Sequence, residues 1–357
     1  MPYITDMFHD QNGTPLRRNH ADVKAVSTAF DRDDFVAQLA ERILGQPDAV
    51  QAVARAVAIA RAGVADPGRP LASVLLVGPT GVGKTELVRQ VSAQIRSGPD
   101  DLCRIDMAAL AQEHYAASFS GAPPGYAGSK ESFTLFDKNK IEGDYYTPGI
   151  VLFDEVEKAD PTVIRSLLHV LDSGELRLAN GRERISFRNC FVFMTSNLGS
   201  KDVAAAQRAG RRRSHWLKRT LGMSRNSVGD EEGLVTTAVE DFFDPEFFNR
   251  IDEMVIMKPF EISTARQVTE REVGLLAERL GRESVELRVH HGVIDFLHDC
   301  GFDQIYGARG LRRTIRTHLI APVAECLSRC RTTMSNPIVV EATLVNGAVV
   351  ANLVTRD

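Results

Sequence analysis

The 357-residue sequence has little of what would place it in several common protein classes. It contains only five scattered cysteines, which we interpret as reduced packing residues rather than a disulfide framework. Its 43 Lys and Arg nearly balance its 47 Asp and Glu, so the chain has no general attraction for nucleic acid. No apolar run approaches the roughly 20 residues of a membrane span, and no secretory signal core is present near the start. We therefore expect a cytoplasmic protein that makes no membrane contact.

Apolar, β-branched runs alternate with helical patterns through the first two thirds of the chain. Helices are expected at 33–44 and 48–62, and a polar stretch without periodicity precedes them. Continuous apolar runs that are separated by helices predict a parallel sheet covered on both faces, that is, a doubly wound α/β domain. The expected strands are 73–77, 102–105, 150–153, 191–194 and 254–257, with helices such as 86–95 and 162–171 between them.

The pattern changes after Pro259, where a smaller α+β domain is expected. It comprises helices at 263–280, 292–298 and 308–327 and strands at 285–289, 338–340 and 349–353. The predicted organisation is thus an N-terminal tail at 1–31, an α/β domain at 32–259 and an α+β domain at 260–357. Residues 201–233 are irregular and charged, and we interpret them as an excursion loop.

The strongest local signal is a glycine-rich loop that follows the first expected strand and precedes a helix. Glycines let successive backbone N–H groups turn toward an anion, and the helix N-terminus adds favourable partial charge. We expect Lys84 to reach the β- and γ-phosphates of a nucleotide and the Thr85 hydroxyl to hold Mg²⁺. The predicted phosphate-binding residues are Gly78, Pro79, Thr80, Gly81, Val82, Gly83, Lys84 and Thr85.

Two further apolar runs end in polar residues that suit nucleotide hydrolysis. The run at 150–153 leads into Asp154 and Glu155, and open α/β sheets bind their ligands at this end of the strands. Asp154 suits the Mg²⁺ shell, whereas Glu155 suits orienting or deprotonating the attacking water. The next run ends at Asn197, which could hold that water near the γ-phosphate. Together these residues predict an ATPase that uses ATP and Mg²⁺.

The order of these motifs resembles the second AAA+ module of the Clp-type chaperone ATPases. The matching strings run from about residue 35 to residue 353 and cover most of the chain. The resemblance implies a P-loop AAA+ nucleotide-binding domain with a C-terminal α+β lid, and it implies assembly into a homo-hexameric ring. The strings are ILGQPDAVQAVARAVAIARAGVADPGRP, GPTGVGKTEL, RIDM, GAPPGYAG, VLFDEVEKADP, SFRN, MTSNLGS, DPEFFNRIDE and YGARGLRR.

The resemblance also implies roles for residues outside the phosphate loop. Arg250 matches the arginine finger that the family supplies to the ATP of a neighbouring subunit. Arg309 matches the second sensor, an arginine that reaches the γ-phosphate from a helix of the small domain. An arginine placed on the transferred phosphoryl group is worth about 10³–10⁵ in rate. The residues implied to line the adenine pocket are Ile43, Leu44, Gly45 and Gln46.

Tyr126 and Ala127 match the pore loop with which the family grips an extended polypeptide. An aromatic side chain at a loop tip can hold such a chain without reading its sequence. The resemblance therefore implies an unfolded or tagged polypeptide as the substrate. The chain departs from the family pattern at Ala127, 129–147, Asp160, 178–180 and Gly310, all away from the phosphate site.

Other interpretations of the partners and the function remain open. The tripeptide Leu221-Gly222-Met223 is similar to the family's docking element for a ClpP-type peptidase, although three residues are a short match. A basic tract at 208–219 contains Trp216, but the acidic chain argues against nucleic acid as a partner. Besides an unfoldase that threads polypeptide through a pore, an AAA+ nucleic-acid remodeller and a nucleotide-gated scaffold are possible. The length suits a single-ring relative or a fragment of a longer protein.

Overall fold

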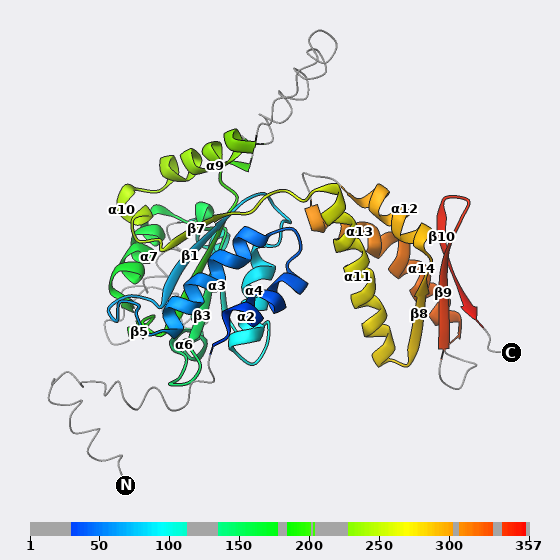
Figure 1. Cartoon of the computed structure of the whole chain (residues 1–357), viewed down its shortest axis with the longest axis horizontal. Helices are drawn as coiled ribbons and strands as arrows, with labels where there is room; N and C mark the ends of the chain where they lie inside the picture. Colours follow the sequence, from blue (N-terminus) through cyan, green and yellow to red (C-terminus); the bar gives the residue numbers. More distant parts are fainter. Residues whose placement is uncertain are drawn as a thin grey trace, which may run out of the picture.

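The computed structural model describes residues 30–112, 135–177, 184–200, 203, 228–302, 307–330 and 338–354. A five-stranded parallel sheet forms its larger part, with the strand order β2-β3-β6-β1-β7 (Figure 1). This order confirms the doubly wound α/β prediction. The strands are β1 (Ala72–Val77), β2 (Cys103–Asp106), β3 (Gly149–Asp154), β6 (Cys190–Ser196) and β7 (Glu253–Ile256).

Alternate side chains of the central strands pack on opposite faces of the sheet, as the period of a strand requires. On β3, Val151 and Phe153 join one apolar cluster, whereas Ile150 and Leu152 join the other. Every residue of β1, β3 and β6 is buried. These strands are mostly apolar, as expected of strands whose two faces are both covered by helices.

Three helices cover one face of the sheet: α2 (Arg32–Arg42), α3 (Pro47–Arg61) and α4 (Lys84–Ile95). The Asp31 side chain caps α2 by accepting from the backbone N–H groups of Asp33 and Asp34. Pro47 occupies the first turn of α3, where its missing N–H costs nothing. The sequence-based bounds of these helices agree with the structure to within two residues.

The opposite face is covered by α7 (Pro161–Ser173), α9 (Val228–Phe242) and α10 (Pro245–Phe248). The excursion loop expected at 201–233 is wrong for residues 228–233, which form the start of α9. Val235 and Val239 of this helix are buried in the core, and this packing supports a helix that the polar residues before it did not suggest. Short elements complete the domain: α6 (Lys138–Glu142), the hairpin of β4 (Glu175–Arg177) and β5 (Arg184–Ser186), and 3₁₀ turns at Met107–Leu110 and Val156–Lys158.

The C-terminal part has its own apolar core and lies to one side of the large sheet (Figure 1). Its strands β8 (Val285–Val289), β9 (Ile338–Val345) and β10 (Ala348–Val354) form a sheet in the order β10-β9-β8. Its helices are α11 (Ile262–Arg282), α12 (His291–Gly301), α13 (Gly307–Ile315) and α14 (Ala321–Cys330). The helix expected at 308–327 contains a π-helical segment, Arg316–Ile320, between α13 and α14. The predicted α+β lid is confirmed.

The division predicted at 259/260 lies in the connection between the end of β7 at Ile256 and the start of α11 at Ile262. Within the described ranges, no helix combines the length and the apolar character that crossing a membrane would need.

Candidate active site

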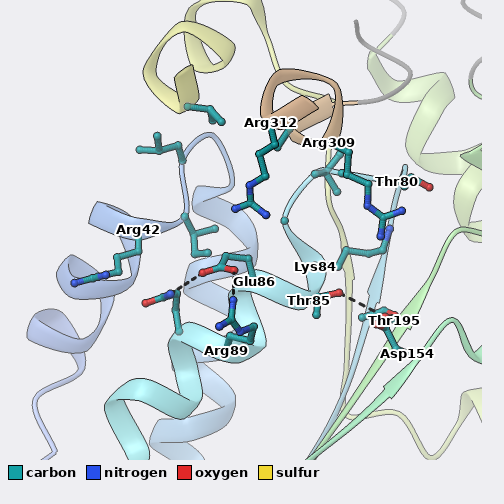
Figure 2. Close-up of a pocket in the computed structure, with 18 of the residues that line it drawn as sticks. Arg42, Thr80, Lys84, Thr85, Glu86, Arg89, Asp154, Thr195, Arg309 and Arg312 are labelled. Atoms are coloured by element: carbon teal, nitrogen blue, oxygen red, sulfur yellow. Dashed lines mark hydrogen bonds and ion pairs between the residues drawn. The ribbon is translucent and has the colours of Figure 1, made fainter. Parts of the chain in front are cut away.

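A cleft of about 570 Å³ lies at the carboxyl ends of β1 and β3, and α11 and α13 of the small domain close its other side (Figure 2). Most of the predicted site residues meet there, although they come from motifs far apart in the sequence. The predicted residues in its wall are Ile43, Leu44, Thr80, Gly81, Val82, Gly83, Lys84, Thr85, Asp154, Glu155, Asn197 and Arg309.

The glycine-rich loop takes backbone conformations that favour glycine. Gly81 has φ 84° and Gly83, which caps the N-terminus of α4, has φ 103°. Gly78 passes so close to β7 that an added Cβ would lie 2.4 Å from the carbonyl oxygen of Met257. Glycine is therefore required by conformation at two of these positions and by close approach at the third.

Lys84 points back into the loop rather than out into solvent. Its Nζ atom donates to the carbonyl oxygen of Pro79 over 2.8 Å and to Asn197 Oδ1 over 2.9 Å, and it also contacts the carbonyl oxygen of Gly78. The residue is 8% exposed, and burial lowers the pKa of Lys84 to about 8. A buried cation whose hydrogen-bond acceptors are all neutral is suited to an incoming anion.

Asp154 ends β3 and holds its carboxylate between three side chains. Its Oδ1 atom lies 2.5 Å from Thr195 Oγ1 and 3.5 Å from Thr85 Oγ1, a contact that Figure 2 marks. Its Oδ2 atom lies 2.5 Å from Nη2 of Arg104, in an ion pair that the sequence motifs did not suggest. Arg104 and Thr195 are thus additional residues of the site. Both lie within matching strings of the sequence, RIDM and MTSNLGS, but neither string alone assigned them to the site.

Glu155 adopts a left-handed backbone conformation, with φ 61° and ψ 55°, which a residue with a side chain rarely takes. Its backbone N–H donates to Thr195 Oγ1 over 2.9 Å, which ties the turn to β6. Its carboxylate accepts from Asn197 Nδ2 over 3.2 Å and forms an ion pair with Lys158. The structure therefore brings the predicted acid and the predicted amide together.

Glu157 is a second carboxylate that sequence reasoning missed. Its Oε1 atom accepts from both the backbone N–H and the side-chain amide of Asn197, each over 3.2 Å. Its other oxygen is buried and has no hydrogen-bond partner among the residues that the structure describes. Glu157 also exerts the largest charge effect on Lys84, where it raises the pKa against the stronger lowering by burial. It fixes the orientation of the Asn197 amide toward Lys84.

Arg309 and Arg312 extend from α13 into the cleft, and Arg309 points toward Lys84 in Figure 2. Arg312 pairs with Glu272 of α11 at 2.7 Å, whereas Arg309 has no ion pair in the part of the chain that the structure describes. The positive charge of Arg309 contributes to the lowered pKa of Lys84. Two cations therefore face one another across the cleft.

The implied adenine pocket is present only in part. Ile43 and Leu44 lie in the wall of the cleft, and α11 adds apolar residues that the sequence did not indicate, namely Val268 and Leu275. Gln46 is buried elsewhere, with its Nε2 atom donating to the carbonyl oxygen of Lys258 over 2.8 Å. Gly45 and Gln46 are not among the residues that line the cleft, so a direct contact between them and a nucleotide stays a prediction.

Arg250 lies apart from the cleft. Its Nη2 atom forms an ion pair with Asp172 of α7 at 3.0 Å, and it is not among the residues that line the cleft of its own chain. The predicted pore-loop residues Tyr126 and Ala127 and the tripeptide Leu221-Gly222-Met223 lie outside the described residues. These roles stay predictions.

The residues present fit ATP and Mg²⁺. Lys84 and Arg309 are two cations that line the same cleft and suit phosphate groups, and the apolar wall formed by Ile43, Leu44 and α11 suits a purine ring. Thr85 and Asp154 offer the hydroxyl and carboxylate oxygens that Mg²⁺ prefers. No group of three or more His, Cys, Asp or Glu within the described ranges could hold a metal, so Mg²⁺ would also need phosphate and water oxygens.

Comparison with known proteins agrees with this geometry. The family model described as the AAA domain (Cdc48 subfamily) matches residues 69–254, and that of the C-terminal D2-small domain of ClpB matches residues 261–340. A Rhodococcus erythropolis protein named ATP-dependent protease ATP-binding subunit-like protein is 58% identical over 347 residues, which are 97% of each chain. A Pseudomonas aeruginosa relative, with the same name followed by AmiB, is 40% identical over 92% of each chain.

Larger chaperones match over only part of their length. Chaperone protein ClpB 1 of Thermosynechococcus vestitus is 38% identical over 82% of this chain but only 31% of its own. Among solved structures, the closed state of Hsp104 with ATPγS and FITC casein has a TM-score of 0.74 at 29% identity. It covers 93% of this chain and 53% of the Hsp104 chain. The chain belongs to the Clp-type AAA+ ATPases, the family of the ClpB and Hsp104 chaperones, and its fold resembles their second module.

Proposed function

We propose that the chain assembles into a homo-hexameric ring that hydrolyses ATP at its subunit interfaces and threads polypeptide through a central pore. The main observation that supports the ring proposal is the position of Arg250. This arginine is bound to Asp172 and does not line the cleft of its own chain, which agrees with a finger that acts on the nucleotide of another copy. In this proposal, assembly brings the arginine finger of one chain to the site of the next.

Each residue of the cleft then has a defined task. Lys84 binds the β- and γ-phosphates through the ammonium group that now contacts Asn197 Oδ1. Glu155 orients and deprotonates the attacking water, and Asn197 holds that water beside Glu155. Asn197 Nδ2 lies 3.2 Å from the carboxylate of Glu155. Arg309 stabilises negative charge on the γ-phosphate from α13 and so couples the small domain to the nucleotide.

A magnesium ion at Thr85 and Asp154 would neutralise charge on the phosphates. The carboxylate of Asp154 is already oriented for this by Thr195, whose hydroxyl lies 2.5 Å from Oδ1. Arg104 pairs with Oδ2 of the same carboxylate and therefore competes with the metal ion for its negative charge. The chain therefore supplies an oriented but partly neutralised ligand.

Threading of a polypeptide is assigned to Tyr126, with Ala127 beside it. Its support is the family resemblance of the loop and the solved structure of Hsp104 with ATPγS and FITC casein. In this proposal, hydrolysis moves the Tyr126 loops along the pore axis and pulls an unfolded or tagged polypeptide with them.

The test is Tyr126→Ala, assayed for ATPase activity and for unfolding of a tagged model protein. We expect ATPase activity within about twofold of wild type, because the resemblance assigns Tyr126 to the pore loop and not to nucleotide binding, and we expect loss of unfolding. Tyr126→Phe, which keeps the aromatic ring, is the matched control and should retain unfolding. Unchanged unfolding by Tyr126→Ala would mean that the threading proposal is wrong.

Docking of a ClpP-type peptidase is a separate proposal. It is motivated by Leu221-Gly222-Met223 and by the name of the Rhodococcus erythropolis relative, which refers to an ATP-dependent protease. Co-elution with ClpP in the presence of ATP, lost in Gly222→Asp, would support it. If the wild-type ring does not co-elute with ClpP, this proposal is removed and the unfoldase proposal is unaffected.

Two other functions remain distinguishable by experiment. A nucleic-acid remodeller would show ATPase activity that DNA or RNA stimulates, with a steep dependence on salt. A nucleotide-gated scaffold would bind its partner normally as Glu155→Gln, without any change in the partner's conformation. We favour the unfoldase because the chaperone relatives share most of this chain.

A further inference from the structure

Arg250 is held from two sides by residues of its own chain. Nη2 of its guanidinium lies 3.0 Å from Asp172 Oδ1, and its carbonyl oxygen accepts a hydrogen bond from Arg69 Nη2 over 2.7 Å. One contact fixes the direction of the side chain and the other fixes the main chain from which it projects. Neither partner belongs to the nucleotide cleft.

Arg69 contacts two separate segments with one guanidinium group. Its Nε atom donates to the carbonyl oxygen of Leu171 over 3.1 Å, and its Nη1 atom lies 3.5 Å from Asp252 Oδ1. Together with the bond to Arg250, these contacts connect the end of α7 with the segment that carries the finger. The planar fork of arginine suits such a divided set of acceptors, whereas the single ammonium group of lysine does not.

The main chain at Arg250 is also fixed to the large sheet. Ser73 Oγ lies 2.8 Å from the Arg250 carbonyl oxygen, and the Ser73 backbone N–H donates to Asp252 Oδ2 over 2.7 Å. The segment that precedes β7 therefore has little freedom relative to β1. What remains to be set is the direction of the guanidinium, and Asp172 sets it.

Asp172 lies in the last turn of α7, close to the segment that carries Arg69. Gly174 ends this helix with φ 63°, and a Cβ added there would lie 3.0 Å from the carbonyl oxygen of Gly68. The end of α7 and residues 68–69 are thus in close backbone contact. A shift of α7 would move both partners of Arg250 together.

We propose that Arg69 and Asp172 are positioning residues for Arg250 and that they affect hydrolysis only in the neighbouring subunit. The inference rests on the proposed function, because it requires Arg250 to act across the subunit interface. Arg250 and Asp172 are half exposed, and such ion pairs add little to stability. By contrast, a displacement of about 1 Å in a group that stabilises the transition state can cost about 100-fold in rate.

The first experiment measures steady-state ATPase kinetics and nucleotide affinity for Arg69→Gln and Asp172→Asn. We expect kcat to fall about 10- to 100-fold, with KM and the affinity for a fluorescent ATP analogue within about twofold of wild type. Asp172→Glu keeps the charge and should recover part of the rate. Arg55→Gln is the matched control, because Arg55 pairs with Glu253 at 2.7 Å near the finger without touching it.

The second experiment mixes each variant with Glu155→Gln subunits, which carry an intact Arg250 but an impaired site of their own. Mixed rings place an intact finger beside the intact site of an Arg69→Gln or Asp172→Asn subunit. We therefore expect the mixture to exceed the sum of the two separate activities. Arg250→Ala mixed with Glu155→Gln is the reference and should recover in the same way.

The outcomes separate the two claims. If the Arg250→Ala mixture recovers but the Arg69→Gln and Asp172→Asn mixtures do not, the inference is overturned and the proposed function stands. If the Arg250→Ala mixture itself does not recover, hydrolysis across the interface is wrong and the inference fails with it. A wild-type kcat in both variants, or a loss of nucleotide affinity equal to the loss of rate, would also overturn the inference.

Discussion

Lys84 Nζ donates to Asn197 Oδ1 over 2.9 Å, and this bond joins two motifs that are 113 positions apart in the sequence. The lysine belongs to the glycine-rich loop after β1, and the asparagine follows β6, which pairs with β1 in the sheet. Because Asn197 also donates to Glu155, the phosphate-binding and water-activating groups are connected through one amide. The cleft is therefore a single network rather than a set of independent motifs.

Removing Arg104 should lower the Mg²⁺ concentration that supports half-maximal ATPase activity. The Arg104 guanidinium pairs with Asp154 Oδ2 at 2.5 Å, so it neutralises part of the charge that the proposed metal site offers. Its side chain is 55% exposed, and exposed pairs are worth about 0.2–1 kcal/mol. We therefore expect Arg104→Ala to lower the requirement by at most about fivefold. A Mg²⁺ titration of ATPase activity measures it.

Arg104→Lys keeps the positive charge near Asp154 and serves as the control, with a Mg²⁺ requirement close to that of wild type. A higher Mg²⁺ requirement in Arg104→Ala would show that the arginine helps Asp154 to bind the metal, which is the opposite of our expectation.

Nucleotide affinity should fall as the pH rises through about 8. Burial lowers the pKa of Lys84 to about 8, so the side chain is protonated well below that pH and becomes deprotonated above it. Phosphate binds the charged form, so the affinity should be constant at lower pH and decline by up to about tenfold per unit above pH 8. Titration of Glu155→Gln with a fluorescent ATP analogue from pH 7 to 9.5 avoids hydrolysis. A constant or rising affinity over that range would contradict this prediction.

Gly149→Ala should destabilise the large domain strongly for such a small change. An added Cβ at the start of β3 would lie 1.8 Å from the carbonyl oxygen of Ile141, so α6 or the strand must move. Overpacking of this kind costs about 1–3 kcal/mol. Gly98→Ala is the control, because nothing lies within 4 Å of the corresponding Cβ. Urea unfolding compares the two, and equal stability of both variants would contradict the close packing of α6 on β3.

The cysteines should differ sharply in their reactivity. Burial raises the pKa of the Cys103 and Cys190 thiols, and both side chains are inaccessible, whereas Cys300 is exposed. Iodoacetamide at pH 8 followed by peptide mass mapping should label Cys300 in the native protein and label Cys103 and Cys190 only after unfolding. Rapid native labelling of Cys190 would contradict the burial of β6.

The central strands β1, β3 and β6 could be predicted from the sequence because each is a nearly continuous apolar run between helices. Phe191 and Phe193 pack on one face of β6 while Val192 and Met194 pack on the other, so no polar residue interrupts the signal. The phosphate loop could be predicted because its glycines are adjacent in sequence. In contrast, α9 could not be predicted from the sequence, because only the burial of Val235 and Val239 in the core supports a helix there.

The remaining site residues depend on tertiary contacts that no local pattern encodes. Arg104 reaches Asp154 only because β2 and β3 are neighbours in the sheet, and Arg312 reaches the cleft only because the small domain closes over it. Glu157 is one of several acidic residues in its motif until its contact with Asn197 is seen. The sequence likewise gave no sign that Asp172 pairs with Arg250.

The role of Glu155 can be tested by measuring ATP affinity and phosphate release on the same preparation of Glu155→Gln. The substitution keeps the shape of the side chain but removes the base, and general base catalysis contributes about 10²–10⁴ in rate. We predict an ATP affinity within about threefold of wild type and a rate of phosphate release that is at least about 100-fold lower. Phosphate release at the wild-type rate would contradict the assignment of Glu155 and of this cleft as the hydrolytic site.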